Sequence, residues 1–383
     1  MTLSALLCWV GLTWAGDAQR WLAPVPSAHT ENPAGLVGVT AQDCGQCHVE
    51  IAKEWAVSTH AHAWTDPQFQ AEYAKDPEVG WLCLNCHTPA GDQQAVLSTY
   101  TGDIRNPQQQ KNHRFSEEWQ QEGVSCAACH VREGRILGPY GDSNAPHPVE
   151  QSSSLLTSEV CLSCHQANVR LEDALVCAFN TGVEASDAGT QKTCQSCHMP
   201  EVERPLVPGG QARPGRMHLW LGGGVPKTVL TPEEKTYYDM FEPGLDVALE
   251  PLVLSSGKRA ELGVVLINAR AGHMLPTGDP ERFYRVVIRV TGEDGRLLVH
   301  QEERIGQEWT WSPRAQKLSD NRLAPSERRV VGVSFKAPRG EVTVEVVAEH
   351  WRISNANAEY HNLGSYPRKA EVLRRNWTLK TGR

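Results

Sequence analysis

The chain has 383 residues, enough for two domains, and a formal net charge of −8 at pH 7. This acidic balance argues against nucleic acid as a partner, because phosphate-binding surfaces need an excess of Lys and Arg. After the first 18 residues, no apolar stretch approaches the length that a membrane-spanning helix needs.

Residues 1–18 form a short apolar run that ends at small residues and resembles a secretory signal peptide. We expect cleavage after Ala15 or Ala18, and therefore a protein that is exported to the periplasm or the cell exterior. The run is too short to span a membrane, since it holds only about 13 apolar residues. Residues 19–42 mix Pro and Gly with polar residues and are interpreted as an extended arm.

Five copies of the sequence Cys-x-x-Cys-His follow, and they use ten of the 12 cysteines. Two thiols three positions apart can add to the two vinyl groups on one edge of a porphyrin, and the next imidazole can bind the iron. The sequence therefore predicts five covalently attached haem c groups. The haem-binding cysteines are Cys44, Cys47, Cys83, Cys86, Cys126, Cys129, Cys161, Cys164, Cys194 and Cys197, and the iron-binding histidines are His48, His87, His130, His165 and His198.

Other uses of paired cysteines fit this repeat less well. Zinc ribbons do not require a His after every second Cys, and a thioredoxin-like motif would occur once. The 155 residues from Cys44 to His198 leave about 31 residues for each haem, too few to build a separate core around each ring. We therefore expect residues 43–200 to form a pentahaem domain in which the haems contact one another. Its secondary structure should be short helices, one after most motifs, joined by long irregular loops.

Residues 49–62, after the first motif, contain no Gly or Pro and are predicted to form a helix. His60 lies 12 residues after His48, or about 18 Å along a helix axis. It is therefore too far away to bind the same iron as His48, and we expect it to serve a neighbouring haem.

The character of the chain changes after the last motif. Residues 201–245 contain several prolines and are interpreted as a linker with a short helix from Thr231 to Met240. From residue 246, alternating β-branched segments separated by turns predict a β-sandwich of immunoglobulin-like type over 246–383. The expected fold class is α+β, with a mostly helical and loop-rich multihaem domain followed by an all-β domain.

Ten histidines lie outside the motifs, and some are expected to bind the second axial position of the irons. The candidates are His60, His113, His147, His218 and His273. His273 lies in a Gly- and Pro-rich loop, residues 271–280, that could reach back to the fifth haem, with Met274 as the rival donor. Cys177 has no motif partner and is interpreted as a buried free thiol.

Residues 44–165 resemble the tetrahaem cytochrome c-554 family, the electron acceptor of hydroxylamine oxidoreductase in ammonia oxidisers. The resemblance lies in Trp55 and His60 after the first motif, in Gly123-Val124-Ser125 before the third, and in the position of the fourth. It implies that His60 binds a haem other than the first, and that a His after the third motif, nearest to His147, also binds iron.

The chain departs from that family by its fifth haem and its β-domain. The family leaves its second haem without a sixth ligand, whereas here His113 lies between the second and third motifs, where the family offers no His. Two alternatives therefore remain for the haem of His87: its sixth position is open, as in the family, or it is occupied by His113.

Taken together, the patterns favour an exported electron-transfer protein over an enzyme. It would carry electrons between redox partner proteins through closely packed, mainly bis-His haems, and association with membrane or outer-surface electron-transfer complexes stays open. One alternative is an oxidoreductase that acts on a small nitrogen or sulfur compound at an open haem, although no Cys-x-x-Cys-Lys sequence is present. Another is a filament-forming extracellular cytochrome, whose subunits would use the same histidines.

Overall fold

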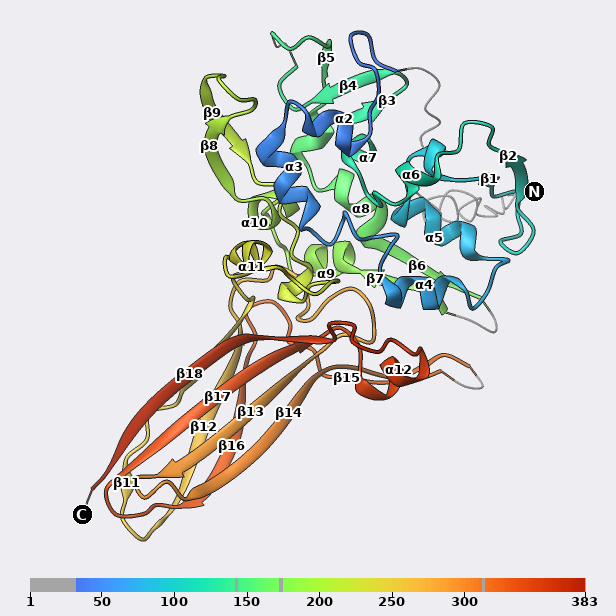
Figure 1. Cartoon of the computed structure of the whole chain (residues 1–383). Helices are drawn as coiled ribbons and strands as arrows, with labels where there is room; N and C mark the ends of the chain where they lie inside the picture. Colours follow the sequence, from blue (N-terminus) through green and yellow to red (C-terminus); the bar gives the residue numbers. More distant parts are fainter. Residues whose placement is uncertain (1–31, 142–143, 172–174, 312–313, 383) are drawn as a thin grey trace, which may run out of the picture.

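The computed structural model describes residues 32–382 except 142–143, 172–174 and 312–313. The expected signal peptide and the start of the expected arm lie outside these residues. Figure 1 shows two parts of different build: a region of short helices and loops, and a long β-domain that points away from it and ends at the C-terminus. In the described residues, no helix is both long and apolar enough to cross a membrane.

The first part contains short helices, as expected. They are α2 (Ala41–Gly45), α3 (Val49–Ala56), α4 (Pro67–Tyr73), α5 (Gly80–His87), α6 (Glu117–Gln120), α7 (Cys126–His130), α8 (Glu159–His165), α9 (Thr181–Asp187) and α10 (Cys194–His198). Only α3 begins directly after a motif, whereas four of the helices contain a motif and end at its His. Small strands join the helices: β1 (Val96–Thr99), β2 (Gln108–Lys111), β3 (Val131–Arg132), β4 (Arg135–Gly138), β5 (Val149–Gln151), β6 (Gln166–Arg170) and β7 (Leu175–Asn180).

The helix expected over residues 49–62 ends earlier, at Ala56. Turns take the chain from there to His60, and the backbone N–H of Thr59 donates to the carbonyl oxygen of Trp220 at 2.8 Å. Val57, Ser58 and Thr59 are poor helix formers, and this contact with a distant segment replaces the missing helical bonds. His60 is thus positioned by a turn rather than by a continuous helix.

Residues 201–245 are more structured than the predicted linker. They form a hairpin, β8 (Glu201–Pro205) with β9 (Ala212–Arg216), and the helix α11 (Pro232–Tyr238), which matches the expected helix near Thr231. Thr231 caps this helix through a reciprocal capping box with Glu234. Between the hairpin and α11, Leu219 and Leu221 are buried against Val57, so this segment packs on the haem-binding region.

The C-terminal part consists of two sheets. One has the strand order β10-β12-β16, and the other has the order β11-β18-β17-β13-β14-β15. The strands are β10 (Leu245–Leu249), β11 (Leu254–Ser255), β12 (Arg259–Asn268), β13 (Phe283–Gly292), β14 (Leu297–Thr310), β15 (Gln316–Asp320), β16 (Arg328–Lys336), β17 (Glu341–Trp351) and β18 (Lys369–Gly382). The helix α12 (Asn355–Tyr360) lies between β17 and β18 in the chain.

The two sheets share one hydrophobic core. Alternate residues of β12, β13, β16 and β17 point inward, and Val264, Ile288 and Val344 have no exposed surface. This period of two is the pattern of a half-buried strand, and each such side chain contributes about 1.5–3 kcal/mol by burial. The arrangement is therefore a β-sandwich that has a core of its own.

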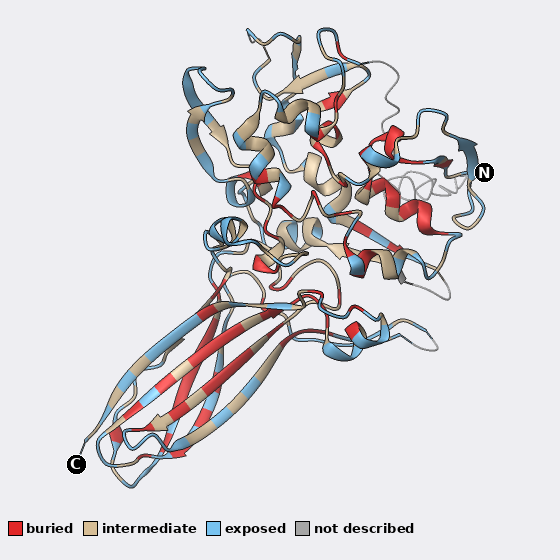
Figure 2. Ribbon diagram, viewed as in Figure 1, coloured by how far each residue is buried: buried red, intermediate tan, exposed pale blue. Residues whose placement is uncertain are grey.

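The haem-binding part lacks a core of comparable size. In Figure 2, the ribbon of its helices and loops is coloured mostly half-buried or exposed, whereas long stretches of the sandwich strands are coloured buried. Its buried apolar residues form small clusters, such as Val39, Ala90, Trp119, Ala127 and Val131. The packing of this region thus depends on something other than its own side chains.

Polar contacts join the two parts at the end of the sandwich. The hydroxyl of Thr190, after α9, donates to the carbonyl oxygen of Gly272 at 2.6 Å. On α9 itself, Glu184 accepts from the Thr277 hydroxyl at 2.6 Å and forms an ion pair with Arg322 at 2.7 Å. These contacts hold the loop at residues 271–280 of the β-domain against the haem-binding part.

Candidate haem-binding site

Four of the five Cys-x-x-Cys-His sequences lie on a short helix that ends at the His: α5, α7, α8 and α10. In the first motif, α2 ends at Gly45, Cys47 lies in a turn, and His48 is the N-cap of α3. Residues three positions apart lie on the same face of a helix, so the two thiols of each of the four helical motifs face the same side. None of the eleven described cysteines forms a disulfide, which leaves all ten motif thiols available for haem.

Thiols of different motifs lie next to one another. Cys44 interacts with Cys126, Cys86 interacts with Cys164, and Cys161 interacts with Cys194. These contacts connect the first motif to the third, the second to the fourth, and the fourth to the fifth. Cys129 of the third motif is in turn close enough to the fourth to act electrostatically on Cys161, so the five sites form one continuous group.

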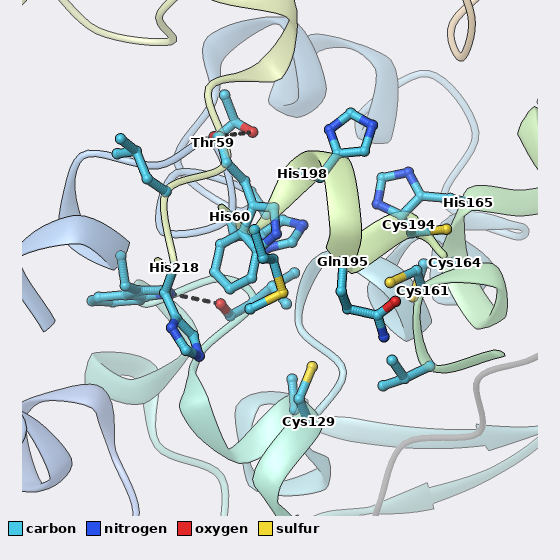
Figure 3. A pocket seen from close by; sticks show the side chains of 18 of the residues that line it. Thr59, His60, Cys129, Cys161, Cys164, His165, Cys194, Gln195, His198 and His218 are labelled. Carbon is cyan, nitrogen blue, oxygen red and sulfur yellow. Dashed lines mark hydrogen bonds between the residues drawn. The ribbon is translucent and has the colours of Figure 1, made fainter. Parts of the chain in front are cut away.

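A single large cavity connects the five sites, and its volume is about 3800 Å³. This is several times the roughly 300–1,000 Å³ of a typical small-ligand pocket. All ten motif cysteines and all five motif histidines line it. Figure 3 shows part of it, with four thiols and the imidazoles of His60, His165, His198 and His218 around one hollow.

Backbone carbonyl groups orient several of these imidazoles. The Nδ1 atom lies 2.7 Å from the Ala63 oxygen in His87, 2.8 Å from the Leu137 oxygen in His130, and 3.2 Å from the Leu206 oxygen in His48. A hydrogen bond from Nδ1–H leaves Nε2 free to bind iron and fixes the ring orientation.

Burial keeps these imidazoles in the form that binds metals. It lowers the pKa of His60 to about 3 and the pKa of His87, His165 and His218 to about 4. The rings are therefore neutral at neutral pH, and a neutral imidazole is the ligating form.

Four motif histidines face a second imidazole across the cavity. The distances between ring centres are 6.5 Å for His48 and His147, 6.2 Å for His60 and His165, 6.3 Å for His130 and His218, and 6.2 Å for His198 and His273. With metal–nitrogen bonds of roughly 2.0 Å on both sides, two imidazoles on one iron have ring centres about 6.2–6.4 Å apart. Three of the four separations lie within this range, and that of His48 and His147 exceeds it by only 0.1 Å, so all four are compatible with bis-His iron sites.

His87 differs from the other motif histidines. Its ring stacks on Phe69, with ring centres 3.7 Å apart and planes at 11°, and no second imidazole is found opposite it within the described ranges. His113 does not supply one, because it lies on an exposed turn after β2 and does not line the cavity. The structure thus brings together four of the five candidate second ligands and leaves His113 apart.

Other residues lie near the haem sites, but the sequence alone gives little indication of their position. Trp220 lies 4.5 Å from His60 and 5.4 Å from His218, measured between ring centres. A high Trp count suggests such packing but cannot say which Trp is involved. Met274, the rival of His273, does not line the cavity, whereas Met199 and Met217 do.

Cys177 is a free thiol on β7 beside Val79 and Leu82. Burial raises the pKa of this thiol to about 12. It is therefore protonated at neutral pH and is a poor nucleophile.

Residues 43–131 match the sequence model of a family described as cytochrome c554 and c-prime. The fold is similar to that of a penta-heme cytochrome c552 from Thermochromatium tepidum, with a TM-score of 0.66 and 19% identity. That match covers 91% of this chain and 100% of the other. The protein is a multihaem c-type cytochrome. It binds haem c covalently, and the motifs provide five attachment sites for it.

The remaining comparisons add nothing about the cytochrome's function. A β-glucuronidase from Bacteroides uniformis matches 37% of this chain and 13% of its own, with 15% identity and a TM-score of 0.20. The C-terminal domain of wzt matches 37% of this chain and 74% of its own, with 11% identity and a TM-score of 0.21. Scores this low carry no argument, and no curated protein matches the sequence.

Proposed function

We propose that the cytochrome carries electrons between redox partner proteins along its group of haems. The observation that supports this best is the set of four imidazole pairs, each with the spacing of a bis-His iron site. An iron with two protein ligands has no position for a substrate, and bis-His haems are typical of electron carriers. Haem supplies the one-electron chemistry, and the protein supplies the ligands, their orientation and the apolar surroundings.

The same pairs argue against end-to-end ligation between subunits. The second ligands His60, His147, His218 and His273 all come from the same chain as their partners, so four irons need no neighbouring copy. A filament linked by ligation would therefore depend on the haem of His87 alone, and we favour a discrete particle. Multihaem c-type cytochromes are generally exported, and we propose that this one acts in the periplasm or at the cell exterior, as its N-terminal residues suggest.

We further infer that the β-domain is an immunoglobulin-like sandwich. Its three-stranded sheet packs on the sheet that contains β18, β17, β13 and β14, and β11 pairs in parallel with β18. In that fold family, such a sheet-on-sheet arrangement presents its loops at the two ends. Here the loops at one end, including residues 271–280, contact the haem-binding part.

A second candidate function is chemistry on a small nitrogen or sulfur compound at the haem of His87. It is favoured by one observation, namely that among the residues that the structure describes His87 faces no second imidazole, while the other four motif histidines do. An iron with one protein ligand keeps a position for an external ligand. The electron-transfer chain would then deliver electrons to this haem.

Spectroscopy of the purified holoprotein tests both candidates. We expect a redox titration to take up five electrons, and the ferric protein to show four low-spin haems and one that binds carbon monoxide after reduction. Five low-spin haems would remove the second candidate, and two or more open haems would contradict the proposed pairing. Steady-state consumption of nitrite or hydroxylamine with an artificial electron donor would favour an enzyme over a carrier.

A further inference from the structure

Charged side chains from both parts of the chain meet in the interior at the domain junction. Asp66, just before α4, and Lys227 form an ion pair of 2.7 Å in which neither side chain is more than 9% exposed. Arg282 directly precedes β13, and Arg352 directly follows β17. All four residues line the cavity that contains the haem-binding motifs.

Several polar atoms at this junction are buried without a partner. Asp66 Oδ1, Glu281 Oε2, His350 Nε2 and Arg352 Nε have no hydrogen bond, and Asp66, His350 and Arg352 are at most 5% exposed. An unpaired buried polar group costs about 1–3 kcal/mol, so such groups in native proteins usually face ordered water, an ion or a ligand. Their convergence marks a polar pocket within a largely apolar cavity.

Arg282 is the most unusual member of this group. Burial lowers the pKa of its guanidinium, and nearby Arg352 adds to the effect. In the described part of the chain, we find no hydrogen bond or ion pair for this side chain. By contrast, the Arg352 guanidinium donates to the backbone oxygen of Val225, and the Arg204 guanidinium pairs with Glu54. Arg282 therefore brings a full set of free donors to the cavity.

The charges at the junction favour an anion. Lys227, Arg282 and Arg352 are opposed by two carboxylates, Asp66 and Asp279. A third carboxylate that acts on Asp279, that of Glu72, is paired with Lys75, so the group keeps an excess of one positive charge. Burial also raises the pKa of Asp279, which weakens its negative contribution. Two further groups add no charge near pH 7: burial raises the pKa of Glu281 to about 8 and lowers that of His350 to about 3.

We propose that Arg282 and Arg352 form a binding site for an oxyanion group inside the cavity, between His87 and His165. A guanidinium presents its donors in a fork that matches the two oxygens of a carboxylate or of a small inorganic oxyanion. Two sources have this chemistry: a propionate of one of the cytochrome's own haems, and a diffusible anion such as nitrite or sulfite. The first source rests on the proposed haems, and the second also rests on the open position at His87.

The position of the site follows from the electrostatic contacts of its members. Lys227 and Asp66 act on His87, and Arg282 acts on His165. The two haems of these histidines are also the pair whose thiols Cys86 and Cys164 touch. An anion bound here would therefore lie beside two neighbouring members of the chain, and it would join the β-domain to both.

The test uses the holoprotein and the variants Arg282→Gln and Arg282→Lys. Arg270→Gln is the matched control, because Arg270 also lines the cavity from the β-domain but is exposed and donates to the carbonyl oxygen of Pro243. Two quantities are measured for each protein: the midpoint potentials of the haems by spectroelectrochemistry, and the absorption change of the ferric protein on titration with nitrite or sulfite.

The two sources give different results. If a propionate is bound, Arg282→Gln lowers the potential of one or two haems, Arg282→Lys largely retains the wild-type potential, and any spectral change caused by either anion is the same in the wild type and in both variants. If a diffusible anion is bound, the wild type shows a saturable spectral change that weakens at least tenfold in both variants.

The proposal is overturned if the Arg282 variants match the wild type in both measurements, or if Arg270→Gln has the same effects as Arg282→Gln. Haem content is measured in parallel, and if Arg282→Gln attaches fewer haems, the anion titration of Arg282→Lys decides. The result is independent of the electron-transfer proposal, which depends on the number of low-spin haems.

Discussion

The two parts of the cytochrome are stabilised in opposite ways. The sandwich has one continuous apolar core, to which both sheets contribute alternate residues such as Leu262 and Val346. The haem-binding part has a cavity of about 3800 Å³ at its centre and only small apolar clusters around it. In one part the side chains are the core, whereas in the other the polypeptide forms a shell for a core that the haems provide.

The same difference appears in the buried charges. On the sandwich, ion pairs such as Arg285 with Glu302 lie on the exposed face of a sheet and contribute little to stability. In the haem-binding part, Glu54 and Arg204 form a pair whose side chains are 4% and 17% exposed. A region without a side-chain core thus uses interior ion pairs to position its loops.

The largest expected effect of this difference is on the haem-free chain. If the chain is produced without haem attachment, we expect the sandwich to fold and the haem-binding part to remain unfolded, because only the first has enough apolar surface of its own. Hydrogen exchange should show protected amides in β12, β13 and β17 and rapid exchange in residues 44–220. Protection of α5 and α8 in that chain would show that the cavity does not need haem.

Truncation of one apolar side chain in each part should destabilise the protein by different amounts. Ile288→Ala is expected to reduce the free energy of unfolding of the holoprotein by about 2–5 kcal/mol, since Ile288 is fully buried in the sandwich. Ile136→Ala, at the edge of a small cluster in the haem-binding part, is expected to cost less than about 1.5 kcal/mol. Guanidinium unfolding followed by far-UV circular dichroism gives both values. Equal decreases in the free energy of unfolding would contradict the view that only the sandwich has a side-chain core.

The sequence allowed much of this organisation to be predicted, because both signals are local. The spacing of two Cys and one His defines each haem site within five residues, and alternation of β-branched residues defines strands. The main strands of the sandwich and the helix near Thr231 were predictable for this reason, whereas the expected helices after most motifs are instead helices that end at the motif His. The long helix to His60 was wrong, because its end is set by Trp220, which is 160 positions further along the chain.

Pairing across the cavity is not a local property, and it was therefore harder to predict. His113 and His147 are both loop residues between motifs, and only the family resemblance favoured His147. In the structure, His147 faces His48 and His113 lies on an exposed turn. The cluster of Asp66, Lys227 and Arg282 was not predictable at all, because its members come from three distant segments. Nothing in the sequence near Arg282 indicates that its guanidinium is directed into the haem cavity.

Glu54→Gln tests the role of interior charge in the haem-binding part. The Glu54 carboxylate pairs with Arg204 and accepts from the backbone N–H of His218 at 2.8 Å, so it fixes the segment that presents this imidazole. We expect the free energy of unfolding to fall by about 1–3 kcal/mol. We also expect one haem to change partly from low spin to high spin, which electron paramagnetic resonance would detect. Glu50→Gln is the matched control on the same helix, since the Glu50–Lys53 pair is exposed, and an equal change in both variants would contradict the role of Glu54.

The smallest effect is expected at the junction between the parts, where Glu281 is held in partly buried surroundings. Burial, followed by the nearby Asp279, raises the pKa of Glu281 to about 8, against about 4.3 in an unfolded chain. The folded state therefore binds the proton more tightly, so this contribution to stability is full below about pH 4.3 and is lost as the pH rises to about 8. In the wild type, we expect Glu281 to lower the free energy of unfolding by on the order of 1 kcal/mol as the pH rises from 5 to 8; partial exposure of the carboxyl keeps this value small. In Glu281→Gln, this part of the pH dependence should be absent. Glu359→Gln, an exposed position on α12, should retain the wild-type slope. A wild-type slope in Glu281→Gln as well would mean that the junction adds no pH sensitivity beyond that of the two parts it joins.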